Sequence, residues 1–318
     1  MNLMFEVNYG VFSVFVALLL TEVIGAVVLL LFYDAARSKV LGYAVPIWEV
    51  TGTFAAFWVV TGDMAYPALL VPVASIFAAL LTVFLVLLVG RNVAISFGEF
   101  VVKRKWLDAK KLYQGYAVST VLLAVNALIL LSALVSGAGI LTNSSPLTAS
   151  FDLSAWASSA GSWLFLLGTI LIAVGLAPVF FDIRPLAGKC FAFTLLGVLV
   201  SILAYYEYSP SLVSAYVAIP AALTLAANLL YFSRRTAAVV VNKAVFVAVL
   251  AMVVFSLQGL VYPDFIGQSV PVDSLTTTGP MVSVFFTVTW VGGALLAVMV
   301  GAYVYVAMRQ SRLPASAG

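Results

Sequence analysis

Two acidic residues, Glu22 and Glu49, lie inside apolar stretches of the chain. A charged side chain at the centre of a bilayer costs about 2.5–3.5 kcal/mol on insertion scales, so each needs a physical reason to be there. A carboxyl group that can exchange its proton at such a depth suits a proton relay. The alternative is a protonated Glu that hydrogen-bonds a neighbouring helix and only helps packing.

We expect no basic residue at the depth of these two carboxyl groups, and therefore no ion pair within the chain; a partner chain would have to supply one. The other deep polar side chains are interpreted as hydrogen-bonding groups between helices. They are Asn126, Asn228, Gln258, Thr287 and Thr289.

The composition shows that most of the chain lies in a membrane, where the depth of a charged side chain determines its energetic cost. Of 318 residues, 64% are hydrophobic and 8% are charged, and the mean hydropathy is +1.17. Soluble domains contain about 25% charged residues, so this composition excludes a cytosolic enzyme, a secreted scaffold and a nucleic-acid binder. There is no His and one Cys, Cys190. Because imidazole and thiolate ligands hold most haem, zinc and iron–sulfur centres, we expect no cofactor or metal on this chain.

Nine apolar segments are long enough to cross a membrane as helices. They lie near residues 8–33, 45–62, 66–90, 112–137, 160–181, 187–206, 211–232, 239–262 and 281–308. We expect the first to remain as a membrane helix, because no basic leader precedes it. The sequence thus predicts an all-α polytopic membrane protein. We divide it into a first four-helix bundle (1–137), an outer loop (138–159), a second four-helix bundle (160–262), and an outer loop with a ninth helix and short tail (263–318).

The distribution of charge supports this count. With nine crossings, all fifteen Lys and Arg residues fall on one side, including Arg91 in the loop after the third segment. The other side carries acidic residues such as Glu6, Asp63 and Asp152. By the positive-inside rule, the N-terminus is outside and the C-terminus is cytoplasmic.

Four stretches, in this order, carry a family resemblance. They are Thr-Glu-Val-Ile-Gly at 21–25, Pro-Ile-Trp-Glu-Val-Thr-Gly-Thr at 46–53, Arg-Asn-Val-Ala-Ile-Ser-Phe at 91–97, and the end from Tyr-Pro-Asp at 262–264 through Leu-Thr-Thr-Thr at 275–278 to Tyr-Val-Tyr at 303–305. The chain resembles subunit II of cytochrome bd-type quinol oxidases, as a divergent member with Glu49 where the family has Asp.

The resemblance implies two four-helix bundles plus one helix, in a multi-pass protein of a prokaryotic plasma membrane. It also implies a haem-free chain beside a haem-bearing subunit I with b- and d-type haems, surrounded by lipid and served by the quinol pool. The complex would oxidise quinol and reduce oxygen, and this chain alone would have no activity. The resemblance implies a proton path through Glu49 and, more weakly, Glu22. Trp48 would pack at the subunit boundary.

Two other functions remain open from the sequence. Possible repeats and midplane acids also suit a proton-coupled secondary transporter, although matched Gly and Pro breaks in the helices are lacking. The chain could also be a scaffold subunit of another respiratory membrane complex. Co-purification with a haem-bearing partner discriminates among these functions.

Overall fold

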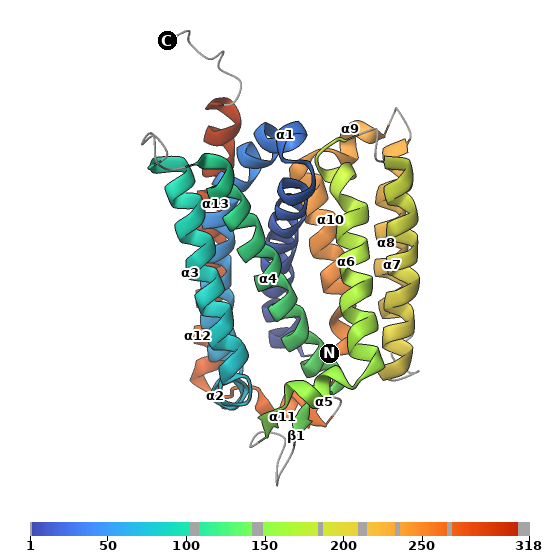
Figure 1. Ribbon diagram of the computed structural model, residues 1–318. Coiled ribbons are helices and arrows are strands. Elements are labelled where there is room, and N and C mark those ends of the chain that lie inside the picture. The colour runs from blue at the N-terminus through green and yellow to red at the C-terminus, as the bar shows by residue number, and fades with distance from the viewer. Residues whose placement is uncertain are drawn as a thin grey trace.

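In a computed structural model, the protein is an all-α, multi-pass membrane protein (Figure 1). The structure describes residues 2–101, 108–141, 149–183, 187–208, 215–232, 236–265 and 269–310. The long helices are α1 (Leu3–Ala65), α3 (Ala78–Phe100), α4 (Ala109–Ser136), α6 (Ala160–Phe180), α7 (Ala187–Tyr208), α8 (Ala215–Phe232), α10 (Lys243–Ser256) and α13 (Gly293–Gln310). The short ones are α2 (Pro67–Ile76), α5 (Leu153–Ala157), α9 (Ala237–Val240), α11 (Val272–Leu275) and α12 (Pro280–Thr287).

All nine predicted segments fall on helices. Within the described residues, eight helical stretches are long and apolar enough to cross a membrane. The apolar stretch of α8, Val217–Phe232, is shorter than these eight. The start of α1 and the end of α13 lie at opposite ends of the molecule (Figure 1), as an odd number of crossings requires. In the last crossing, a π-helical turn (Val288–Gly292) joins α12 to α13.

The first two predicted segments are two helical halves of α1, and they meet at Phe32, whose backbone is not helical (φ −137°, ψ 39°). The predicted loop between them, 34–44, is helical although it contains Gly42. Residues 34–41 contain no Pro or Gly and include good helix formers such as Ala, Arg and Lys. The chain turns back after the kink, so its start and the beginning of α2 both lie at the lower end in Figure 1.

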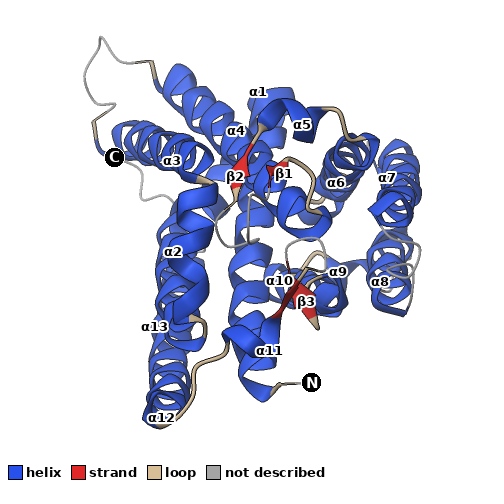
Figure 2. Cartoon of the chain, turned by 90° about the horizontal axis from the view of Figure 1, so that it is seen from below, coloured by secondary structure: helices blue, strands red, loops and turns tan. Residues whose placement is uncertain are grey.

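The third predicted segment, 66–90, is two helices separated at Phe77. The views in Figures 1 and 2 show α2 lying across the lower end of the molecule, while α3 makes the crossing. At 1.5 Å per residue, the 23 residues of α3 span about 34 Å. The crossing therefore ends about ten residues later than predicted, and Arg91 lies inside it instead of in the following loop.

The lower end is closed by short elements. The antiparallel pairs β1 (Ile140–Leu141) with β2 (Ser150–Phe151) and β3 (Asp264–Phe265) with β4 (Val270–Pro271) lie there with α5 and α11 (Figure 2). The indole N–H of Trp156 donates to Ser132 Oγ at 2.9 Å and ties α5 to α4. The 138–159 segment therefore forms an ordered cap where it is described; residues 142–148 lie outside the described part.

The helices pack on one another through two large apolar clusters, one at each end of the bundle. Helix α1 contacts α4, α6 and α10. Helix α1 thus packs against helices of both predicted bundles, and the boundaries of these bundles remain predictions.

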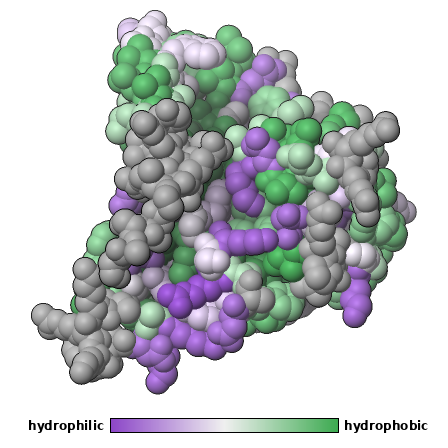
Figure 3. Space-filling view, turned by 90° about the horizontal axis from the view of Figure 1, so that it is seen from above, coloured by the Kyte–Doolittle hydropathy of each residue, from purple (hydrophilic) through white to green (hydrophobic). Residues whose placement is uncertain are grey.

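Charged residues gather at the upper end, where Figure 3 shows hydrophilic side chains among apolar ones. Lys110, Lys189 and Lys243 lie at the starts of α4, α7 and α10. Lys39 Nζ donates to the Phe181 and Asp182 carbonyls at 3.4 and 3.3 Å, which stabilises the C-terminal end of α6. The predicted basic residues at 103–105, 184, 234, 235 and 312 lie outside the described residues.

Candidate functional site

A buried ion pair lies inside the first half of the molecule. Arg91 Nη1 of α3 is 2.9 Å from Glu22 Oε2 of α1, and the two side chains are 2% and 0% exposed. The expectation that no cation lies at the depth of Glu22 is wrong. The physical reason is the shift of the third crossing, which places Arg91 within the membrane span instead of at its end.

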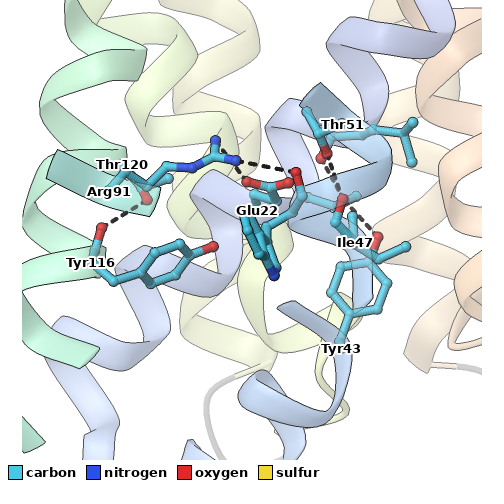
Figure 4. Close-up of polar contacts among 10 residues, drawn as sticks. Glu22, Tyr43, Ile47, Thr51, Arg91, Tyr116 and Thr120 are labelled. Atoms are coloured by element: carbon cyan, nitrogen blue, oxygen red, sulfur yellow. Dashed lines mark hydrogen bonds and ion pairs between the residues drawn. The ribbon is translucent and has the colours of Figure 1, made fainter. Parts of the chain in front are cut away.

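The pair is held by both halves of α1 and by α3, and α4 lies beside it (Figure 4). Arg91 Nη2 also donates to the Trp48 carbonyl at 3.4 Å, in the second half of α1. The Thr51 hydroxyl lies beside Glu22 and donates to the Ile47 carbonyl at 3.0 Å. Tyr116 of α4 is close enough to interact electrostatically with both charges. All four crossing segments of the first predicted bundle therefore meet here.

Several polar atoms of this site have no hydrogen-bond partner among the described residues. They are Glu22 Oε1, Arg91 Nε and the Tyr116 hydroxyl, all buried. Buried polar groups are almost always satisfied by protein or by ordered water. Glu22 Oε1, Arg91 Nε and the Tyr116 hydroxyl are therefore the least satisfied polar groups of this site.

Two more hydroxyl groups flank the carboxylate. Thr21 and Tyr43 share a hydrogen bond of 2.7 Å between their oxygens, and Thr21 also donates to the Leu18 carbonyl at 2.7 Å. Because Thr21 and Tyr43 come from the two halves of α1, this contact joins the halves one residue from Glu22. The site is thus rigidly framed on the α1 side.

The second predicted acid, Glu49, faces away from this site. Its side chain is exposed on the second half of α1, although it follows Trp48, whose carbonyl contacts Arg91. The structure therefore separates the two acids: Glu22 points into the bundle and Glu49 points outward. Trp48 itself is half-buried against the apolar cluster that contains Tyr116.

The other deep polar residues have mixed outcomes. Asn126 Nδ2 donates to the Leu80 carbonyl at 2.9 Å, which confirms a bond between α4 and α3. Asn228 Nδ2 donates within its own helix to the Thr224 carbonyl at 3.3 Å, and its interpretation as a group linking helices stays a prediction. Gln258 Oε1 and Thr289 Oγ1 are buried without a partner among the described residues.

Sequence reasoning missed Arg91 and Tyr116. The signal for Arg91 was present, because apolar residues continue on both sides of it in Leu-Leu-Val-Gly-Arg-Asn-Val-Ala-Ile. A basic residue so flanked is either a helix end or a buried charge, and only a partner at matching depth decides between them.

The sequence matches no protein-family model and no curated protein. A comparison with solved structures gives a different result. The fold resembles that of a bd oxidase. The chain aligns with a protein of the bd oxidase structure from Geobacillus thermodenitrificans with a TM-score of 0.70, at 16% sequence identity, over 97% of each chain. At this identity the likeness concerns the fold, and it agrees with an all-α polytopic membrane protein.

Proposed function

We propose that this chain is the haem-free subunit II of a cytochrome bd-type quinol:oxygen oxidoreductase in a prokaryotic plasma membrane. The observation that carries the proposal is the shared fold, which extends over 97% of both aligned chains. In this proposal, b- and d-type haems and the quinol reaction belong to a partner, subunit I. The chain has no His. No group of three or more metal-binding side chains occurs among the described residues.

The outward face that carries Glu49 supports a partner. Along the second half of α1, the exposed residues recur every three or four positions as Glu49, Gly52, Thr53 and Ala56. Figure 2 shows α3, α13 and α12 along one side of the molecule, and these are the least buried of the long apolar stretches described. Small residues on such a face allow another helix to approach closely.

The carboxylate of Glu49 indicates that this face of α1 is not exposed to lipid. An ionised Glu facing hydrocarbon carries a cost of several kcal/mol, whereas a protein neighbour can hydrate or pair it. We therefore assign the face to contact with subunit I, and we place Trp48 at the subunit boundary.

The proposed role of the chain in catalysis is proton delivery from the cytoplasm. The exposed side chain of Glu49 has no ion-pair partner among the described residues, and we assign its carboxyl oxygens to the proton path. We place Glu22 on the same path as the ion-pair partner of Arg91, 2.9 Å away. Oxygen chemistry itself takes place on the partner's haems.

The proton role is tested with Glu49→Gln in the purified oxidase complex. We expect quinol-oxidase turnover to fall about 100-fold, the lower end of what a positioned proton-transfer group contributes. Glu6→Gln, in the first turn of α1, is the matched control and should leave turnover unchanged. Unchanged turnover in Glu49→Gln would reject the proton path and leave Glu49 as a packing residue.

The partner face is tested with Ala56→Trp. The added ring should block close approach by subunit I, so that haem no longer co-purifies with the tagged chain. Leu203→Trp, on the exposed surface of α7, is the control and should retain haem. Equal haem recovery with both variants would place subunit I on another face.

A further inference from the structure

The contact between Glu22 and Arg91 has the geometry of a buried ion pair. A guanidinium stays protonated in proteins, so a protonated Glu22 would leave Arg91 as an unpaired cation at 2% exposure. Breaking a buried pair in this way is strongly unfavourable, because the remaining charge has no compensation. The 2.9 Å contact therefore favours a carboxylate on Glu22 as the counter-charge of Arg91.

Arg91 has a second contact that Glu22 does not explain. Its Nη2 reaches the Trp48 carbonyl at 3.4 Å, and the next residue in the chain is Glu49. The guanidinium is a planar fork, so an arginine anchored on Glu22 through Nη1 presents Nη2 in a fixed direction. The position of the Trp48 peptide, and hence of the outward-facing Glu49, is tied to the buried pair.

The turn that carries Glu49 has other reasons to need this support. Pro46 lies within α1 and has no backbone N–H to donate to the preceding turn. Thr51 and Thr53 donate back to the carbonyls of Ile47 and Glu49, and such bonds bend helices slightly. The hydrogen bond from Arg91 of α3 therefore fixes a stretch of α1 that the backbone hydrogen bonds of α1 hold less firmly.

We propose that Arg91 is a positioning residue: it keeps Glu22 as a carboxylate and, through the Trp48 carbonyl, fixes the turn of α1 that presents Glu49 to the partner. This inference rests on the proposed proton role of Glu49. It assigns Glu22 a structural charge and leaves proton exchange to Glu49.

The inference is tested by a double-mutant cycle on turnover in the purified complex. Arg91→Gln should lower turnover about tenfold or more, since a misplacement of about 1 Å can cost as much as 100-fold. In a Glu49→Gln background, Arg91→Gln should have little further effect, because residues that act through one group are not additive. Arg91→Lys keeps the cation and should recover part of the activity.

An infrared measurement tests the charge of Glu22 without reference to activity. If Glu22 is ionised in the wild type, Glu22→Gln should remove no protonated-carboxyl band from the spectrum. Arg91→Gln should add such a band, because Glu22 then loses its counter-charge. Lys110→Gln is the matched control, because it breaks the exposed pair with Asp34 (3.2 Å); it should change neither the band nor turnover.

The outcomes separate the inference from the proposed function. If Glu49→Gln lowers turnover but Arg91→Gln acts by the same factor in both backgrounds, the positioning role is overturned while the proton role stands. If Glu49→Gln has no effect, the proton role fails and the positioning role fails with it. A protonated Glu22 in the wild type overturns the fixed pair directly. Should Arg91→Gln fail to assemble, the neutral variant Glu22→Gln/Arg91→Gln replaces it in the cycle, with the same expected non-additivity.

Discussion

At the scale of residues, the buried pair should dominate the stability of the first half of the molecule. Arg91→Ala leaves Glu22 buried without a counter-charge, so we expect the free energy of unfolding to fall by about 3–5 kcal/mol. Replacing both residues by apolar ones, as Glu22→Leu/Arg91→Leu, should recover most of this loss. Thermal unfolding of the detergent-purified chain measures both. A double variant as unstable as Arg91→Ala would show that the loss comes from packing instead of charge.

Asp152 offers a pH-dependent test at the lower end. The hydroxyl and amide of Ser154 and the amide of Ala155 donate to its carboxylate, and these bonds lower the pKa of Asp152 below its usual 3.8. A lowered pKa stabilises the fold above pH of about 4, and this contribution is lost as the pH falls through the folded-state value.

We therefore expect Asp152→Ala to unfold at a lower temperature than the wild type at neutral pH, with the difference shrinking in acid. Melting curves from about pH 7 down to about pH 3 check this. A difference that does not depend on pH would contradict it.

The sequence predicts both acids from residue type and surroundings, because a Glu in an apolar run is conspicuous. It does not predict that they face opposite ways. Glu22 and Glu49 lie on two halves of one helix, and the directions of their side chains depend on the kink at Phe32, which no local motif announces. It also does not predict the partner of Glu22, because Arg91 pairs across 69 positions of sequence.

At the scale of elements, the contact of α6 with α7 depends on glycine. A Cβ on Gly175 would lie 2.6 Å from the Thr194 backbone nitrogen and 2.8 Å from the Cys190 carbonyl oxygen. Backbone atoms cannot move aside easily, so Gly175→Ala should separate the helices and destabilise the protein by about 1–3 kcal/mol. Gly188→Ala, with open space around its Cβ, is the control and should be neutral or slightly stabilising. Equal melting temperatures would contradict this close packing.

Helix existence is predictable here, and helix boundaries are less so. Each apolar segment became a helix because the bilayer requires internally satisfied backbone groups. Hydropathy does not distinguish α2, which lies across the end of the bundle, from α3, which crosses it, because both are apolar. For this reason alone, the sequence predicts Arg91 in the loop, whereas the structure has it within the membrane span.

At the scale of the whole molecule, the orientation in the membrane remains a prediction from charge. In a Cys190→Ala background, Ser274→Cys at the lower end should react with an impermeant maleimide on intact cells. Lys111→Cys, at the upper end, should react only after the cells are opened. The reverse labelling pattern would place the N-terminus in the cytoplasm and remove the cytoplasmic origin of the proposed proton path.

The central claim is that a chain without His acts beside a chain that holds the haem. The most direct test is to purify the tagged protein from native membranes, record its visible spectrum, separate the chains under mild conditions and record each spectrum again. The account predicts a coloured complex in which all haem stays with the partner and this chain is colourless. A colourless protein that purifies alone, and moves a solute into liposomes, would contradict it.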